Sequence, residues 1–259
     1  MQIALVAPTY QERDNIEAFL RAVRASLPDA SILICDDNSP DGTAELAEKV
    51  GAELGHIEVL HRPTKEGLGA AYRQGFRHAI DAGAEIVIQM DVDFSHPPAM
   101  LPALVAAVEA GADVAIGSRY VPGGDTPDWS LHRKLLSHYG NIYARAQLRL
   151  ATRDSTSGLR AYRSSILEQI NFDTTRANGY GFQIETAYRL RVAGATAIEL
   201  PLVFHDRVHG MSKMSVPIMA ENMALVTWWG LCLRAPKLTG RFRETSIGRY
   251  LAHRTTPST

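Results

Sequence analysis

Hydrophobic residues alternate along the chain between short unbroken runs and longer segments with helical spacing. Runs rich in β-branched residues and bounded by turn residues predict buried strands at 2–7, 31–35, 57–61 and 86–90, with further strands at 114–118 and 197–204. Amphipathic spacing predicts helices at 14–26, 42–50, 68–82 and 131–150. Strands that alternate with helices indicate right-handed β-α-β units, and therefore an α/β fold with a mainly parallel sheet.

Polar residues directly follow several of these strands. The fourth strand ends in Asp91-Val92-Asp93, and acidic turns also follow the first two strands. Ligands of a parallel sheet bind beyond the carboxyl ends of its strands, so we expect these turns to meet at one edge. Two neighbouring carboxylates repel each other unless a cation lies between them, and Mg²⁺ or Mn²⁺ accepts carboxylate, water and phosphate oxygens. The alternative is an ordinary turn, because a single Asp-x-Asp is common.

Composition excludes several classes of function. The 259 residues, 46% hydrophobic and 21% charged, are typical of one large globular domain, and a net charge of -1 gives no indication of a nucleic-acid partner. Cys35 and Cys232 lack metal-binding spacing and predict buried free thiols in a reducing compartment. Neither a dinucleotide-binding glycine motif nor a P-loop is present. A nucleotide would therefore be held through its base, its ribose and a metal-bound diphosphate.

Six motifs, taken together, resemble one known family. They are PTYQERDN at 8–15, DDNSPDGT at 36–43, KEGLGAAY at 65–72, DVDFSHPP at 91–98, GSRY at 117–120 and GYGFQIE at 179–185. In this order and spacing the chain resembles family 2 glycosyltransferases of the GT-A fold, and among them the polyprenol-phosphate (dolichol-phosphate) mannose synthases. The resemblance implies a Rossmann-like sheet flanked by helices and a metal-dependent, inverting transfer of mannose from GDP-mannose to a polyprenyl monophosphate.

The resemblance also implies the roles of individual residues on the donor side. Nucleotide-sugar binding is expected from Pro8, Tyr10, Glu12, Asp37, Asp91, Asp93, Gln183, Arg207 and Lys213. Asp91, Asp93 and Ser95 are expected to hold the metal, although some relatives carry Gln where this chain has Ser95. Glu185 is expected to orient the sugar or a loop, or alternatively to cap the helix that follows.

Basic residues are expected to meet the anionic groups. The resemblance assigns the lipid phosphate to Arg119, Arg133 and Ser137, and the catalytic set to Asp93, Arg119, Arg207 and Lys213. A planar guanidinium suits bidentate contact with phosphate. For Arg133 the alternative is a solvated surface charge.

The acceptor determines the mechanism. A phosphate monoester has a second pKa of about 6 and is already ionised near neutral pH, so no general base is required. We expect in-line attack of the lipid phosphate oxygen on the anomeric carbon, with inversion. Two alternatives remain: a relative that uses UDP-glucose or another nucleotide sugar, and a catalytically silent scaffold at a membrane.

The C-terminal part predicts contact with a membrane. We expect a catalytic domain at 1–215, an amphipathic interfacial or docking helix at 216–240 and a basic tail at 241–259. The uncharged stretch 223–233 is too short to span a bilayer, and its paired Trp228 and Trp229 suit the headgroup boundary. The alternatives are a core helix or docking on an integral membrane protein. Without a visible signal peptide, we expect a peripheral enzyme on the cytoplasmic side of the membrane.

One segment rich in Gly and Pro separates the metal side of the chain from the acceptor side. The stretch 122–129 predicts a lid over the acceptor site, or alternatively a rigid loop.

Overall fold

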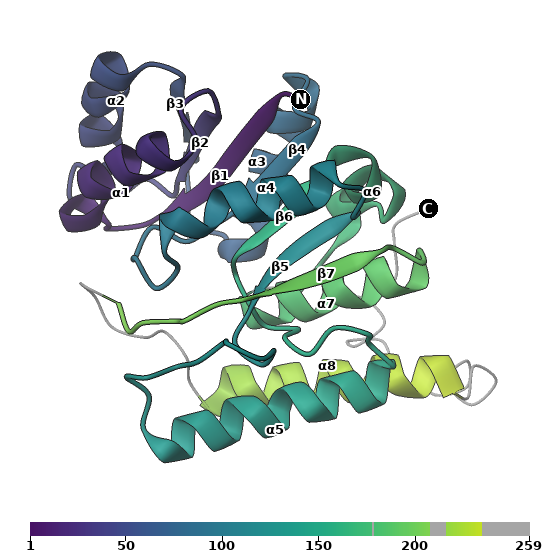
Figure 1. The fold of residues 1–259 in the computed structure, drawn as a ribbon. Helices are drawn as coiled ribbons and strands as arrows, with labels where there is room; N and C mark the ends of the chain where they lie inside the picture. The colour runs from purple at the N-terminus through teal and green to yellow at the C-terminus, as the bar shows by residue number, and fades with distance from the viewer. Residues whose placement is uncertain (178, 208–215, 235–259) are drawn as a thin grey trace.

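A seven-stranded sheet with the order β3-β2-β1-β4-β6-β5-β7 forms the centre of the molecule (Figure 1). The computed structural model describes residues 1–177, 179–207 and 216–234. Its strands are β1 (Ile3–Thr9), β2 (Ser31–Asp36), β3 (Ile57–His61), β4 (Ile86–Gln89), β5 (Val114–Ser118), β6 (Arg160–Arg163) and β7 (Ala197–Pro201). All neighbours pair in parallel except β6, which runs antiparallel to both β4 and β5. The predicted α/β class is confirmed.

Helices cover both faces of the sheet. One face carries α1 (Arg13–Ser26), α2 (Thr43–Leu54) and α4 (Leu101–Glu109), and the other carries α3 (Leu68–Asp81), α6 (Ser164–Gln169) and α7 (Tyr180–Val192). In α1 the residues Ile16, Phe19, Leu20 and Val23 are fully buried at helical spacing, which explains its orientation. Burial of each such side chain stabilises the fold by roughly 1.5–3 kcal/mol.

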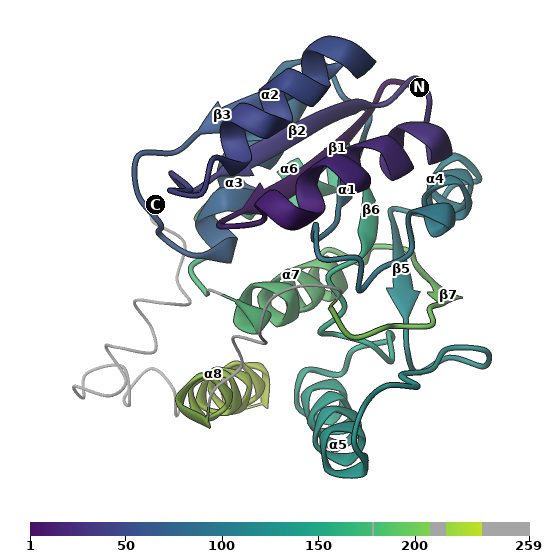
Figure 2. The ribbon, with the colours of Figure 1, turned by 90° about the vertical axis from the view of Figure 1, so that its left-hand side faces the viewer.

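Two helices, α5 (Leu131–Leu148) and α8 (Val216–Arg234), lie side by side away from the sheet, as Figures 1 and 2 show. Trp228 and Trp229 of α8 are buried against residues of α5 and α7. The paired indoles therefore do not face a headgroup layer, and the core-helix alternative describes them. Among the described residues, no helix combines the length and apolar character needed to cross a bilayer. The predicted helix beyond residue 234 and the basic tail lie outside the described residues.

The segment predicted as a lid is tied to the strand-like stretch after β7. Asp125 donates its N–H to the Leu202 carbonyl at 3.0 Å and accepts the N–H of Phe204 at 2.9 Å. Trp129 is buried, with its ring centroid 5.4 Å from that of Phe204. These contacts favour the rigid-loop alternative.

Candidate active site

A cavity of about 480 Å³ opens beyond the carboxyl ends of β1, β2, β4 and β5. Lys213 lies outside the described residues, but the other twelve residues predicted for the site all line this cavity. They are Pro8, Tyr10, Glu12, Asp37, Asp91, Asp93, Ser95, Arg119, Arg133, Ser137, Gln183 and Arg207. The structure brings them together; their individual roles stay predictions.

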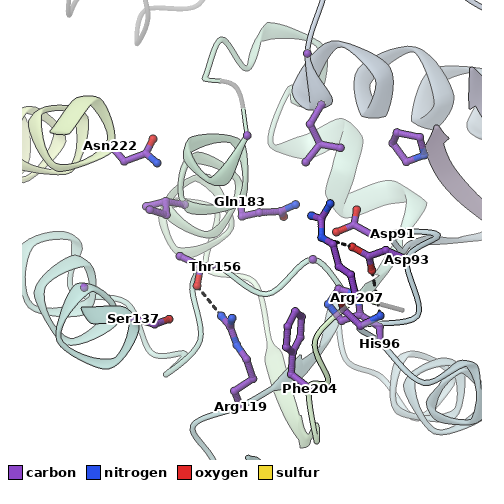
Figure 3. A pocket seen from close by; sticks show the side chains of 18 of the residues that line it. Asp91, Asp93, His96, Arg119, Ser137, Thr156, Gln183, Phe204, Arg207 and Asn222 are labelled. Atoms are coloured by element: carbon purple, nitrogen blue, oxygen red, sulfur yellow. Dashed lines mark hydrogen bonds and ion pairs between the residues drawn. The ribbon is translucent and has the colours of Figure 1, made fainter. Parts of the chain in front are cut away.

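The two carboxylates among the three predicted metal ligands, Asp91 and Asp93, lie side by side just beyond β4 (Figure 3). Asp93 forms an ion pair with Arg207, with 2.8 Å between Oδ2 and Nε, and its Oδ1 accepts the backbone N–H of Ser95 at 3.0 Å. Asp91 accepts the phenolic O–H of Tyr72 at 3.0 Å. Burial and the adjacent charge of Asp93 raise the pKa of Asp91 to about 7, against the opposing effect of the Tyr72 hydrogen bond.

This arrangement fits a divalent cation. Burial and the repulsion from Asp93 disfavour the charge on Asp91 even with Arg207 paired to Asp93, and a bound divalent cation would offset both effects. The hydroxyl oxygen of Ser95 is buried and has no hydrogen-bond partner within the described part of the chain. At Gly158 an added Cβ would lie 3.1 Å from Asp91 Oδ2, so glycine keeps the space beside this carboxylate open. In the described segments no group of three or more Asp, Glu, His or Cys side chains could by itself hold a metal ion, so a cation at Asp91 and Asp93 would need further oxygen ligands from water and phosphate.

Where the nucleoside is predicted to bind, an arginine that the sequence analysis missed holds Asp37. Arg62 directly follows β3, and its guanidinium pairs with Asp37 while donating to Gln74 at 2.9 Å. The Arg62 side chain is only 1% exposed, so it acts from beneath the cavity. Burial raises the pKa of Asp37, and the charge of Arg62 opposes the shift. Lys65 Nζ lies 3.6 Å from the centroid of the Tyr10 ring.

Arg119, predicted to bind the lipid phosphate, is held by a buried carboxylate. Arg119, just beyond β5, donates from Nε to Asp154 at 2.7 Å and from Nη2 to Asp154 at 2.6 Å. Asp154 is fully buried. Burial opposes its ionisation, but the charge and hydrogen bonds of Arg119 outweigh burial and hold the pKa of Asp154 below its usual value. Sequence reasoning missed Asp154, because no motif marks it.

The other predicted phosphate ligands lie on α5. Arg133 donates to Asp206 at 2.7 Å, and its guanidinium lies 4.1 Å from the centroid of the Trp129 ring. Ser137, one helical turn away, accepts the hydroxyl of Tyr120 at 2.6 Å. Arg133 is thus anchored at the cavity wall, in contrast to a freely solvated surface charge.

The far end of the cavity is built by helices and is mainly apolar, although Asn141 and Asn222 also line it. Residues of α5, α7 and α8 contribute its lining, among them Leu136, Ala144, Ile184, Met223 and Val226. None of these five was predicted, because their place depends on how α8 packs against α5. The cavity therefore has a charged end at the sheet edge and an apolar end between the two helices.

The two residues predicted on α7 differ in their surroundings. Gln183 is buried, lines the cavity and points toward Asp91 (Figure 3), and its Oε1 has no hydrogen-bond partner within the described segments. Glu185 accepts the backbone N–H groups of Arg176 at 3.0 Å and Ala177 at 2.9 Å, and it pairs with Arg189. Glu185 therefore orients the loop that precedes α7, rather than capping a helix that follows it.

Comparison with known proteins gives consistent matches. The model of glycosyl transferase family 2 matches residues 4–170. The chain is 42% identical over 241 residues to an undecaprenyl-phosphate mannosyltransferase of Micrococcus luteus, covering 93% of this chain and 99% of that protein. It is 41% identical to a polyprenol monophosphomannose synthase of Mycolicibacterium smegmatis, covering 92% and 91%. A mannosyltransferase of Pyrobaculum calidifontis, solved with GDP-mannose and Mn²⁺, has a similar fold, with a TM-score of 0.58 at 19% identity over 97% of this chain and 80% of that one.

Proposed function

The chain belongs to glycosyl transferase family 2, and from this membership we propose that it transfers mannose from GDP-mannose to a polyprenyl monophosphate. The predicted resemblance and the GT-A fold are thereby confirmed. One observation carries the proposal: a single cavity joins a carboxylate pair at the sheet edge to an apolar end between α5 and α8. Such a cavity suits a nucleotide sugar at one end and a lipid at the other. The names of the relatives that are 42% and 41% identical support this acceptor.

On the donor side, Tyr10 would stack on the base while Asp37, held by Arg62, accepts hydrogen bonds from it. Asp91 and Asp93, with Ser95, would hold a divalent cation that, when bound, neutralises the diphosphate. The Arg207 guanidinium already provides positive charge at Asp93. On release from Asp93 it would be free to contact the diphosphate oxygens and stabilise the departing GDP.

On the acceptor side, the lipid phosphate would be positioned by Arg119, Arg133 and Ser137. Its oxygen is already ionised near neutral pH, so it attacks the anomeric carbon directly as the bond from that carbon to GDP breaks. The direction of attack opposite to the leaving group inverts the anomeric configuration. Gln183 would orient the sugar from the opposite wall of the cavity.

The test is to incubate the purified chain with GDP-mannose, a short polyprenyl phosphate and either Mg²⁺ or Mn²⁺, and to detect mannosyl-phosphoryl lipid by mass spectrometry. We expect product only with a divalent metal, and the two metals are compared by titration. UDP-glucose serves as the matched donor control. Product from UDP-glucose alone would replace the donor assignment, and absence of any GDP binding by calorimetry would contradict the proposal as a whole.

We also propose that the enzyme works as a peripheral protein on the cytoplasmic face of a membrane, with the outer face of α5 against the lipid. Five large apolar side chains of α5 are solvent-exposed: Leu131, Leu135, Leu136, Tyr139 and Ile142. Positions 131, 135, 139 and 142 fall on one helix face. The helix contains Arg133, Lys134 and Arg145 but no Asp or Glu, which suits anionic headgroups. Leu136 also lines the cavity, so this face continues into the apolar end of the site.

Sedimentation with vesicles tests this surface. Leu135→Glu combined with Tyr139→Glu should reduce binding to vesicles that contain anionic lipid by about tenfold or more, because charged groups would enter the interface. Val192→Glu is the matched control, since Val192 is 60% exposed on α7. Equal binding by both variants would remove α5 from the contact. If the wild type binds native membranes but not protein-free vesicles, an integral membrane partner holds it instead.

A further inference from the structure

A buried polar network lies beneath the acceptor end of the cavity. At its centre Asp154 accepts three hydrogen bonds from Arg119: the backbone N–H at 3.1 Å, Nε–H at 2.7 Å and Nη2–H at 2.6 Å. Both Asp154 oxygens take part, so the carboxylate fixes the plane of the guanidinium as well as its position. Asp154 is fully buried and does not line the cavity. It can act on a ligand only through neighbours that line the cavity: mainly Arg119, and Thr156, whose hydroxyl donates to it at 3.3 Å.

The same network connects Arg119 to α5. Thr156 accepts a hydrogen bond from Arg119 Nη2 at 2.7 Å (Figure 3) and another from Asn141 Nδ2 at 3.1 Å. Asn141, on α5, accepts the backbone N–H and the hydroxyl of Ser155, each at 2.8 Å. The network thus fixes the end of β5, the segment before β6 and α5 to one another around the Arg119 guanidinium.

The loop around Asp154 is held both by its own carboxylate, which accepts the backbone N–H of Thr156 at 3.2 Å, and from β7. Glu199 on β7 accepts the backbone N–H of Arg153 at 2.7 Å and that of Asp154 at 2.9 Å. The backbone is therefore held from the neighbouring strand, while the Asp154 side chain is directed at Arg119. A buried ion pair is in general weak evidence of a gain in stability. Its place under the predicted phosphate site suggests a role in function.

We propose that Asp154 is the positioning residue for the acceptor phosphate, holding the Arg119 guanidinium in the plane and place in which it meets the lipid phosphate. The proposal depends on the function proposed above. An arginine side chain that is already immobilised loses little further conformational entropy when it binds phosphate. Asp154 therefore acts on acceptor binding and on the orientation of the attacking oxygen, and leaves donor binding unchanged.

The first test is Asp154→Asn, which keeps the shape but removes the charge and one acceptor oxygen. We expect kcat/KM for a short polyprenyl phosphate to fall by about tenfold to a hundredfold, as when a charge-assisted hydrogen bond is lost. The KM for GDP-mannose and the affinity for GDP should stay within about twofold of the wild type. Glu199→Gln is the matched control, because it changes a carboxylate that holds the same loop without touching Arg119.

A double variant separates positioning from a general structural role. If Asp154 acts through Arg119, Asp154→Asn should have little further effect on acceptor kinetics once Arg119→Ala is present. Thr156→Val removes a neutral acceptor of Arg119 whose hydroxyl also donates to Asp154 at 3.3 Å, and it should raise the acceptor KM by a few fold with the KM for GDP-mannose unchanged. This milder variant decides the question if Asp154→Asn fails to fold.

The outcomes are distinct. Unchanged acceptor kinetics in Asp154→Asn, multiplicative effects in the double variant, or equal losses in donor and acceptor use would each overturn the positioning role. Calorimetry with the short polyprenyl phosphate and GDP-loaded protein gives a readout that does not require turnover, and weaker acceptor binding by the variant is expected. A wild-type enzyme that neither binds nor uses this acceptor would instead contradict the proposed function itself.

Discussion

The two ends of the cavity are built in different ways. At the donor end, Pro8, Asp37 and Asp91 lie at or just beyond the ends of adjacent parallel strands, where the sheet itself sets their spacing. At the acceptor end, the lining comes from α5, α7, α8 and the segment before β6, which only tertiary packing brings together. The residues predicted for the donor therefore owe their spacing to the geometry of a sheet edge, whereas those predicted for the acceptor depend on how separate helices pack.

The strongest test of this division is at the carboxylate pair. Asp93→Ala should reduce transfer by about 10³-fold even at saturating metal, because a ligand of the cation and the partner of Arg207 are lost together. The melting temperature should change little, since the repulsion between Asp93 and Asp91 disappears as well. Initial rates and thermal melts measure both. Asp29→Ala, which changes an exposed carboxylate distant from Asp93 in the sequence, is the control. Near-normal activity in Asp93→Ala would contradict the metal assignment.

A substitution of Arg62 should weaken binding at the donor end of the cavity and leave the acceptor end unchanged. Arg62→Lys keeps the charge but cannot serve Asp37 and Gln74 together, so Asp37 loses its fixed orientation. We expect the Kd for GDP to rise by about tenfold to fiftyfold, with the KM for the lipid phosphate unchanged. Calorimetry and steady-state kinetics provide the two numbers. An equal loss of acceptor affinity would show that the two ends are not independent.

The donor end should also respond to pH. Because the pKa of Asp91 is raised to about 7, the folded metal-free protein takes up a proton between about pH 4 and 7 that the unfolded chain does not bind. Its stability should therefore fall as pH rises through this window. Metal must displace the same proton, so affinity for Mn²⁺ should increase by about tenfold per pH unit up to about pH 7 and then level off. A flat profile of Mn²⁺ affinity against pH, measured by calorimetry, would contradict this.

The smallest effect is expected from a substitution of Tyr72, whose hydroxyl contacts Asp91. Tyr72→Phe removes the hydrogen bond to Asp91 and should raise its pKa further, since that bond favours the ionised form. We expect a fewfold loss of Mn²⁺ affinity at pH 6 and a smaller loss at pH 8. The ratio of the two affinities is the measurement. A loss that is the same at both pH values would assign Tyr72 a purely structural role.

The donor end was largely predictable from sequence because its residues follow apolar strands. The chain order of strand and polar turn was enough to place Asp91, Asp93 and Asp37 at one edge. Arg62 follows β3 in the same manner, and that position was the one signal that could have revealed it. Tyr72 reaches Asp91 from the face of α3, a contact that no local pattern specifies.

The acceptor end was predictable only where family motifs marked it. The strand β6 was missed because three of its four residues, Arg160, Tyr162 and Arg163, are polar or amphipathic, so no apolar run indicates it, although Arg160 and Tyr162 are fully buried. Asn141 and Thr156 meet across different elements, and neither spacing nor charge predicts the pair. The sequence analysis assigned membrane contact to the tryptophans of α8, but both are buried. An uncharged stretch does not reveal which face of a helix is covered by a neighbouring helix.

The reversed direction of β6 has a consequence for how such enzymes diversify. Because β6 runs antiparallel to β5, the chain leaves the sheet at the end of β5 and returns at the same edge to begin β6. The stretch 119–159 between these points contains Arg119, α5 and Asp154, and it begins and ends at the same edge of the sheet. An exchange of this excursion for another of different length would leave every strand register intact. The segment 119–159 can therefore be exchanged for another that suits a different acceptor, while the strands that are predicted to position the nucleotide sugar stay the same.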